Sequence, residues 1–248
     1  MAVPHGITAV VTGAASGIGQ AVAQRLRDEG NRVAACDVNP LIGEDPDGFV
    51  LDVTDGPAVT NTIDHIEKTI GEISVLVNAA GILRRGDLTT ITDADWHALV
   101  AVNTTGVLNT MRAVAQAMLP RQRGSIITVS SNAAGVPRQG IGGYAATKAA
   151  ATHLTRCLGL ELAPHGIRCN VVAPGSTDTP MLRQLWGVER INDSAVAAGD
   201  PSAFRIGIPL GLVARPADVA ASVCFLASDD ASNLTMQELY VDGGAALR

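Results

Sequence analysis

Aromatic side chains are scarce in this chain of 248 residues, which has three Phe, two Tyr and two Trp although 47% of its residues are hydrophobic. Ala, Val, Leu and Ile must therefore fill the core, as they do in parallel α/β folds. A chain of this length is often one α/β domain, so we expect residues 1–248 to form a single unit.

Cysteine, positive charge and long apolar runs are also scarce. The four cysteines (Cys36, Cys157, Cys169 and Cys224) are scattered without a CxxC pair, which predicts buried residues of a reducing compartment rather than disulfides or zinc ligands. The five histidines have no ligand spacing, so we expect no metal site. The formal net charge of −6 argues against nucleic acid or an anionic membrane as a partner. No apolar run approaches the roughly 18–20 residues of a membrane span, and residues 1–6 lack a signal-peptide pattern, so we expect a soluble, cytoplasmic protein.

A glycine-rich turn (residues 13–19) follows the first apolar run, residues 7–12, and precedes a helical apolar face. This order is typical of a dinucleotide-binding opening, because glycines let the backbone approach a pyrophosphate and a helix N-terminus supplies free N–H groups. An ordinary strand-to-helix turn is the alternative. The cofactor-binding residues predicted here are Gly13, Ser16, Gly17, Ile18 and Gly19.

An acidic residue, Asp37, ends the second apolar run about twenty positions beyond the glycines. A carboxylate there can accept both hydroxyls of an adenosine ribose, and it would repel a 2′-phosphate. Neither Ala15 nor Val38 supplies the positive charge that such a phosphate needs, so the sequence favours NAD over NADP. The alternative is a strand-end Asp that caps the next turn.

Two further expected strands end in polar or small residues. Residues 39–48 are rich in turn formers, which argues against a full crossover helix, and residues 49–53 are expected to form the third strand. A fourth strand, residues 74–77, runs into a segment whose small side chains would let a backbone pass close to a cofactor. Ligands of open parallel sheets bind at the carboxyl ends of strands. The residues expected to contact the cofactor at these ends are Asp52, Val53, Asn78, Ala79 and Gly81.

Tyr144 and Lys148 are four residues apart and therefore lie on one face of an expected helix. An ammonium close to a phenol favours the phenolate, lowers the pKa of the Tyr side chain and makes it a usable general base. The alternative is a surface helix with an incidental aromatic residue and a solvated Lys.

These motifs, taken in chain order, resemble the short-chain dehydrogenase/reductase family. The resemblance covers the chain from end to end. It implies a three-layer α/β fold of Rossmann type, with a seven-stranded parallel sheet and helices on both faces, assembled as a homotetramer. The motifs are Thr12-Gly13-x-x-x-Gly17-x-Gly19, Asn78-Ala79-Ala80-Gly81, Tyr144-x-x-x-Lys148, Pro174-Gly175 and Val241-Asp242-Gly243-Gly244.

The resemblance also implies a catalytic set. The family residue that matches Asn103 kinks its helix and holds a water beside the catalytic Lys. Of two adjacent serines, Ser131 lies thirteen residues before Tyr144, which is the usual separation in the family, so the first serine is assigned to packing. In the implied mechanism Tyr144 removes the alcohol proton and Ser131 hydrogen-bonds the reacting oxygen. Lys148 lowers the pKa of Tyr144 and holds the nicotinamide ribose.

The segment after the expected sixth strand, residues 168–173, is implied to approach the nicotinamide amide. Residues 180–205 are the least regular part of the chain and are expected to form a lid over the substrate, with a flexible surface excursion as the alternative. The cofactor-binding residues implied in this part are Pro174, Gly175, Thr177 and Thr179.

Two arginines fall near the expected pocket. Arg84 follows the fourth strand, and Arg138 lies between Ser131 and Tyr144. A semi-buried Arg is suited to bidentate contact with a substrate carboxylate, although either residue could instead be a solvated loop charge.

Further segments resemble a narrower group in the family, the dehydrogenases that make catechols for siderophore biosynthesis. This resemblance implies NAD-dependent oxidation of a ring secondary alcohol in a small carboxylated cyclic diol. The substrate-binding residues would be Arg84, Ser131, Arg138 and Tyr144. The alternatives are another NAD-linked member acting on a different secondary alcohol or a 3-oxoacyl thioester, and a non-catalytic NAD-binding sensor. The segments are residues 78–84, 121–124, 137–140, 168–179 and 207–211.

Overall fold

The apolar runs form a seven-stranded sheet in the computed structural model, which describes residues 6–247. The strands are β1 (Thr8–Thr12), β2 (Arg32–Asp37), β3 (Gly48–Val50), β4 (Ile73–Asn78), β5 (Gly124–Val129), β6 (Ile167–Pro174) and β7 (Glu238–Val241). Their order is β3-β2-β1-β4-β5-β6-β7, and all neighbouring pairs are parallel. The predicted sheet is confirmed. The prediction about a signal peptide falls on residues 1–6, of which 1–5 lie outside the described part.

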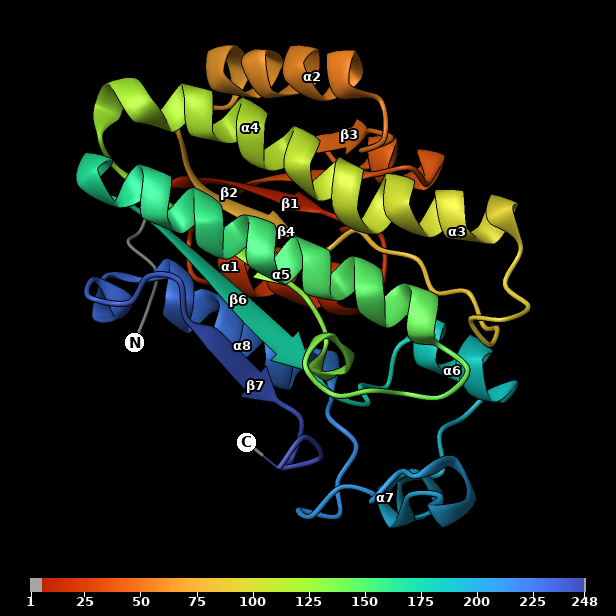
Figure 1. Ribbon diagram of the computed structural model, residues 1–248. Coiled ribbons are helices and arrows are strands. Elements are labelled where there is room, and N and C mark those ends of the chain that lie inside the picture. Colours follow the sequence, from red (N-terminus) through yellow and green to blue (C-terminus); the bar gives the residue numbers. More distant parts are fainter. Residues whose placement is uncertain (1–5, 248) are drawn as a thin grey trace.

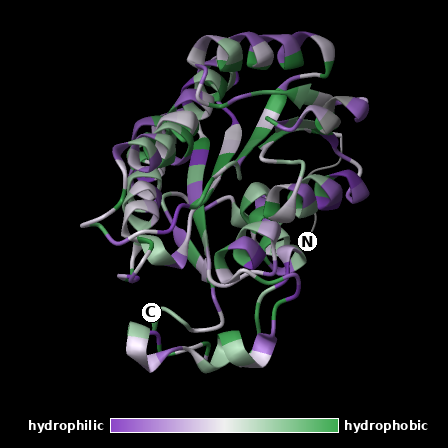
Figure 2. Ribbon diagram, turned by 90° about the vertical axis from the view of Figure 1, so that its right-hand side faces the viewer, coloured by the Kyte–Doolittle hydropathy of each residue, from purple (hydrophilic) through white to green (hydrophobic). Residues whose placement is uncertain are grey.

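Helices cover both faces of the sheet, as predicted (Figure 1). One face packs against α1 and α8, and the other packs against α2, α4 and α5. Figure 2 shows hydrophobic residues along the strands and polar residues on the outer sides of the flanking helices. The helices are α1 (Gly17–Asp28), α2 (Gly56–Thr69), α3 (Asp93–Val100), α4 (Val107–Met118), α5 (Gly142–Leu162), α6 (Pro180–Trp186), α7 (Asp193–Ala198) and α8 (Pro216–Ala227).

Aliphatic side chains fill both core layers, as the scarcity of aromatics predicted. Among residues 6–247, Tyr144 is the one aromatic residue that is buried, and it belongs to neither layer. Because a buried Tyr hydroxyl usually requires a hydrogen-bond partner, we expect Tyr144 to have one.

Within residues 6–247 no helix combines the length and the apolar character needed to cross a bilayer.

The third strand is shorter than predicted, because β3 ends at Val50. Asp52 lies two residues beyond the strand, where its Oδ1 accepts a hydrogen bond from Thr54 N at 2.9 Å. Asp55 then caps α2 by accepting a hydrogen bond from Ala58 N. The short polar side chains hydrogen-bond the local backbone and so end the strand early.

The two irregular regions of the sequence have different structures. Residues 39–48 contain no full crossover helix, as predicted, but a short 3₁₀ helix, Pro40–Glu44. The predicted lid, residues 180–205, contains two short helices, α6 and α7. Thr179 and Asn192 begin these helices, because each side chain accepts a hydrogen bond from a backbone N–H three residues later.

Candidate active site

The carboxyl ends of β1, β4, β5 and β6 lie at one edge of the sheet, where the predicted site residues gather. Thr12, the last residue of β1, holds the turn that follows β4. Its Oγ1 accepts hydrogen bonds from Ala79 N and Ala80 N, both at 3.2 Å. Thr12 is the first residue of the glycine-rich motif, but the motif alone does not predict this role of its hydroxyl.

The glycine-rich turn after β1 requires glycine at particular positions. Gly13 has a φ of 68°, and a Cβ there would lie 2.7 Å from Ala80 N. A Cβ at Gly19 would collide with the carbonyl oxygen of Gly13. Ser16 precedes α1 without a side-chain capping bond, and the first turn of α1 has no acidic residue. Free N–H groups and the positive end of the helix dipole therefore suit the pyrophosphate of a dinucleotide.

Asp37 lies at the carboxyl end of β2, beside the glycine-rich turn. Its Oδ2 accepts a hydrogen bond from Ala15 N at 3.0 Å, and its Oδ1 accepts one from Asn39 N at 2.9 Å. A carboxylate has about four acceptor sites, so lone pairs remain for ribose hydroxyls. Neighbouring Val38 is 67% exposed and uncharged. The remaining acceptor sites of Asp37, next to the uncharged Val38, fit the hydroxyls of an unphosphorylated adenosine ribose.

Two of the residues predicted to contact a cofactor use their polar groups inside the protein. The buried side chain of Asn78 accepts a hydrogen bond from Thr110 Oγ1 at 2.6 Å and donates one to Thr128 Oγ1 at 3.4 Å. The carbonyl of Val53 accepts a hydrogen bond from Asn109 Nδ2 at 3.0 Å. These bonds fix the loops beside the glycine-rich turn.

The predicted kink at Asn103 is a π-helical turn, Ala101–Gly106, between α3 and α4. The side chain of Asn103 is fully buried. Its Oδ1 accepts from Ile82 N at 2.9 Å, and its Nδ2 donates to Ile82 O at 2.9 Å and to Thr147 Oγ1 at 3.1 Å. The amide therefore ties the segment after β4 to α5.

Lys148 is buried behind Tyr144 on α5. Its Nζ donates a hydrogen bond to Val129 O at 2.9 Å and lies 5.9 Å from the centroid of the Tyr144 ring. Burial lowers the pKa of Lys148 to about 8, because a low-dielectric environment penalises the ammonium. A Cβ at Gly81 would lie 3.3 Å from this Nζ and from Asn103 Oδ1, so a glycine there keeps the two groups close.

The pKa of Tyr144 differs from the prediction. Burial raises it to about 12, and the hydrogen bond with Ser131 acts in the opposite direction but is the smaller effect. This shift is opposite to the predicted lowering by Lys148, because burial penalises the phenolate. Tyr144 is therefore protonated in this structure and hydrogen-bonded to Ser131.

The two adjacent serines have different environments. Ser130 is buried, and its Oγ donates to Lys148 O at 3.2 Å and pairs with Thr152 Oγ1 at 2.6 Å. Ser131 lies at the start of the next turn, where its Oγ accepts from Ala133 N at 3.2 Å and is within reach of Tyr144. Ser130 is thus a buried packing residue, and Ser131 occupies the hydrogen-bonded position beside the phenol of Tyr144.

Tyr144 and Ser131 face a cleft of about 520 Å³ between the sheet edge and the lid segment. The loop after β6 forms another wall and lies against the glycine-rich turn, since a Cβ at Gly17 would be 3.3 Å from Thr179 Cγ2. Residues of this loop thus line the same cleft as Tyr144 and Ser131. The predicted residues that line the cleft are Ile18, Ser131, Arg138, Tyr144, Pro174, Gly175, Thr177 and Thr179.

Comparison with known proteins agrees with this arrangement. The profile of a protein family described as enoyl-(acyl carrier protein) reductase matches residues 13–246. The 2,3-dihydro-2,3-dihydroxybenzoate dehydrogenase of Bacillus subtilis is 46% identical over 98% of this chain and 97% of its own. The chain belongs to the short-chain dehydrogenase/reductase family.

Two further comparisons fit this family. The vibriobactin-specific 2,3-dihydro-2,3-dihydroxybenzoate dehydrogenase of Vibrio cholerae is 42% identical over 96% of this chain and 95% of its own. The ligand-free structure of the aldohexose dehydrogenase of Thermoplasma acidophilum has a TM-score of 0.86, with 33% identity over 98% of this chain and 95% of that chain. The chain is therefore an oxidoreductase of the short-chain dehydrogenase/reductase fold.

The two predicted substrate arginines of this short-chain dehydrogenase lie in different places. Arg84 is exposed, pairs with Asp95 at 3.4 Å and does not line the cleft. Arg138 lines the cleft, where its Nη2 donates to Ala245 O at 3.3 Å. Burial and the charge of Arg205 both lower the pKa of Arg138. The structure thus brings Arg138, but not Arg84, to the cleft that Tyr144 and Ser131 line.

Sequence reasoning missed several residues of the cleft. Arg85, next to Arg84, reaches the cleft and donates to Leu185 O of α6 at 2.9 Å. Arg205 and Trp186 of the lid segment also line it. Adjacent arginines in a loop carry no periodicity that shows which one faces inward. The signal available for Arg205 was only its place in the segment expected to cover the substrate.

Proposed function

We propose that this protein oxidises 2,3-dihydro-2,3-dihydroxybenzoate to 2,3-dihydroxybenzoate with NAD, in the cytoplasm and for catechol siderophore biosynthesis. One observation carries the proposal. A chain 46% identical to an enzyme of that name brings the guanidinium of Arg138 into the same cleft as Tyr144 and Ser131. A carboxylated substrate needs a cation in this place, and a simple alcohol does not.

Tyr144 and Ser131 would act on the hydroxyl that becomes a ketone. Ser131 hydrogen-bonds the reacting oxygen, and the phenolic oxygen of Tyr144 accepts the hydroxyl proton and passes it towards Lys148. NAD, when bound, supplies the nicotinamide that accepts the hydride from the ring carbon. The resulting cyclic ketone tautomerises: the ring carbon that bears the other hydroxyl loses its proton and the ketone oxygen gains one. This step gives an aromatic catechol, so the oxidation is strongly favoured.

The residues of this chain fit NAD. The glycine-rich turn and the N-terminus of α1 would hold the pyrophosphate, and Asp37 would accept the adenosine ribose hydroxyls. Lys148 would donate to the nicotinamide ribose, and Asn103 would keep the backbone beside Lys148 in place. Because Asp37 would repel a 2′-phosphate and the exposed side chain next to it, Val38, is uncharged, we propose NAD rather than NADP.

A direct assay tests the function. The purified protein is incubated with NAD and the dihydrodiol acid, and the formation of NADH and of catechol fluorescence is followed. We expect both signals to rise together, and Tyr144→Phe to reduce the rate by at least about a hundredfold because the proton acceptor is lost. Turnover of another alcohol or of a 3-hydroxyacyl thioester, with none of the dihydrodiol acid, would show a different member of the family. Binding of NAD without turnover of any alcohol would indicate a sensor.

A further inference from the structure

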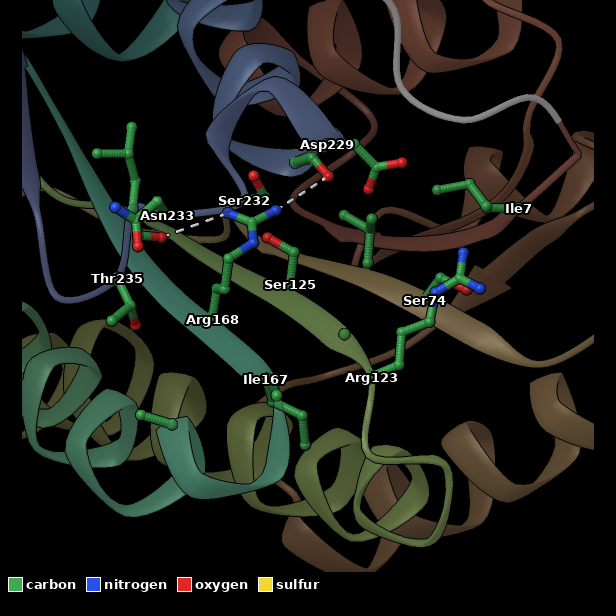
Figure 3. A pocket seen from close by; sticks show the side chains of 16 residues that line it. Ile7, Ser74, Arg123, Ser125, Ile167, Arg168, Asp229, Ser232, Asn233 and Thr235 are labelled. Atoms are coloured by element: carbon green, nitrogen blue, oxygen red, sulfur yellow. Dashed lines mark hydrogen bonds between the residues drawn. The ribbon is translucent and has the colours of Figure 1, made fainter.

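A second cavity, of about 400 Å³, lies at the amino ends of β4, β5 and β6, away from the catalytic edge. Figure 3 shows Arg168 beside Ser125 in this cavity. The guanidinium of Arg168 donates to backbone carbonyls, among them Leu226 O at 2.7 Å and Ser228 O at 3.1 Å, and Ser125 Oγ also donates to Leu226 O. The two side chains thereby satisfy backbone carbonyl groups at the carboxyl end of α8. Their donors are therefore used within the fold and are not available to a ligand.

Arg205 projects from the lid segment into the catalytic cleft. Its backbone is held by two hydrogen bonds with Asp200, N to O in each direction and both 2.9 Å long. Its guanidinium lies over the ring of Trp186, 5.0 Å from the ring centroid. The pairing with Asp200 and the cation–π contact fix this cation at the cleft wall.

Both Arg205 and Arg138 retain hydrogen-bond donors. Within residues 6–247, Arg205 makes no side-chain hydrogen bond, and its nearest carboxylate oxygen, Asp200 Oδ2, is 3.9 Å away. That distance exceeds hydrogen-bond range. Arg138 makes one long bond, 3.3 Å, to Ala245 O. An Arg has five donors, so most of the donors of this pair have no protein acceptor.

The two guanidinium groups are close enough for the charge of Arg205 to lower the pKa of Arg138, and Arg138 is also partly desolvated. The carboxylate of Asp242 acts on Arg138 in the opposite direction but is the smaller effect. Two like charges that line one cleft repel each other, and an anion between them would relieve the repulsion. Asp87 and Asp200 also line the cleft, but Asp200 directs Oδ1 to Ser202 N and Ser202 Oγ. A ligand carboxylate could fill the acceptor positions that these residues leave open.

We propose that Arg205 and Arg138 together form the carboxylate-binding subsite, so that Arg205 couples recognition of the substrate anion to the position of the lid. The inference rests on the proposed function and adds to it a second cation, from a separate segment of the chain. A planar carboxylate accepts parallel hydrogen bonds from guanidinium groups, and binding it between a loop residue and a lid residue would hold α6 and α7 over the ring.

Binding of a simple anion tests the subsite without turnover. Benzoate and its neutral isostere benzamide are titrated into the enzyme–NADH complex, and the change in NADH fluorescence is measured. We expect wild-type protein to bind benzoate at least about tenfold more tightly than benzamide. Arg205→Gln should weaken benzoate binding by roughly tenfold and leave benzamide binding unchanged. Arg190→Gln is the matched control, because Arg190 is an exposed lid residue that does not line the cleft.

The kinetic arm uses the dihydrodiol acid as substrate. Arg205→Gln should raise KM by roughly ten- to a hundredfold with a smaller change in kcat, and Arg205→Lys should recover part of the loss. Equal affinity for benzoate and benzamide, or an equal effect of Arg205→Gln on both, would overturn the subsite even if the dihydrodiol acid is turned over. Selective benzoate binding that depends on Arg205, without turnover of the dihydrodiol acid, would uphold the subsite and refute the proposed substrate.

Discussion

Burial shifts the two ionisable groups of the Tyr144–Lys148 pair in opposite directions. It raises the pKa of Tyr144 to about 12 and lowers that of Lys148 to about 8. Below pH 8 both groups therefore hold their protons, and the first proton lost comes from Lys148. The pair can then accept the proton of the alcohol, so we predict that kcat/KM for oxidation rises with pH to a plateau above about pH 8. Initial rates between about pH 6 and pH 10 check this.

Two comparisons assign that pH profile to the buried pair. The reverse reaction, reduction of a ketone, should lose rate over the same pH range because it needs the proton. In Lys148→Met the residual oxidation should no longer show the step near pH 8. A wild-type rate that does not change with pH, or a step that survives in Lys148→Met, would contradict this assignment.

The preference for NAD over NADP should depend on the charge of Asp37. Asp37→Asn removes the negative charge but retains an acceptor, so we predict a rise in KM for NAD of about tenfold and a smaller discrimination against NADP. Adding Val38→Arg should then favour NADP, since Val38 is exposed beside Asp37 and an Arg there could pair with a 2′-phosphate. Steady-state kinetics with both cofactors measure the ratio. Glu44→Gln, an exposed acid on the next turn, should leave it unchanged; equal effects of the two acid substitutions would refute the role of Asp37.

Single residues differ in how well the sequence predicted them. Ser131 could be chosen over Ser130 because it lies thirteen residues before Tyr144, the usual separation in the family, and the structure places Ser131 within hydrogen-bonding reach of the phenol. The direction of the Tyr144 pKa shift could not be predicted. It depends on the balance between a charge and a burial penalty, and residue spacing reveals only the charge.

The π-helical turn is the element on which the back of the site depends. Asn103 satisfies both backbone groups of Ile82 and also bonds Thr147. In Asn103→Ala the N–H and C=O of Ile82 would lose these partners in a partly buried position. We predict a loss of about 2–4 kcal/mol in the free energy of unfolding, measured by urea denaturation, and a fall in kcat.

An exposed amide gives the control for this substitution. Asn61 lies on the outer side of α2, and Asn61→Ala should change the free energy of unfolding by less than about 0.5 kcal/mol. If Asn103→Ala were no less stable than Asn61→Ala, the amide would not be holding the segment after β4.

Element boundaries were predicted correctly where the hydrophobic periodicity runs up to the boundary. They were missed where a polar side chain that hydrogen-bonds the local backbone ends the element. The strand that ends at Asp37 matches its prediction. The third strand was predicted too long because Asp52 hydrogen-bonds the chain after it. In the lid, α6 and α7 were missed because helices of seven and six residues are too short to show an amphipathic period.

At the scale of the whole molecule, the parallel order of the sheet explains why motifs distant in sequence form one site. Thr12, Asn78 and Pro174 end β1, β4 and β6, and parallel strands bring these ends to one edge. That convergence was predictable from the order of motifs. The approach of Arg205 to Arg138 was not, because it depends on how residues 180–205 fold beside the cleft rather than on strand order.

The same molecule-wide arrangement motivates our proposal of a homotetramer. Figure 1 shows α4 and α5 side by side on one face of the sheet, and each carries an exposed leucine, Leu108 (40% exposed) and Leu160 (68% exposed). Burying such side chains against another copy would be favourable. We predict a solution mass, by light scattering, of about four times the 25.5 kDa chain.

Charge substitutions locate the surface that holds the tetramer together. Leu160→Glu should shift the protein towards smaller species, because the interface would then bury an unpaired carboxylate. Leu212→Glu should not, although Leu212 is equally exposed at 66%, because it lies in the loop before α8 rather than on α5. A monomeric wild type at every concentration would refute the tetramer. A tetramer insensitive to Leu160→Glu but disrupted by Leu212→Glu would instead place the interface on the side of the molecule that carries α8.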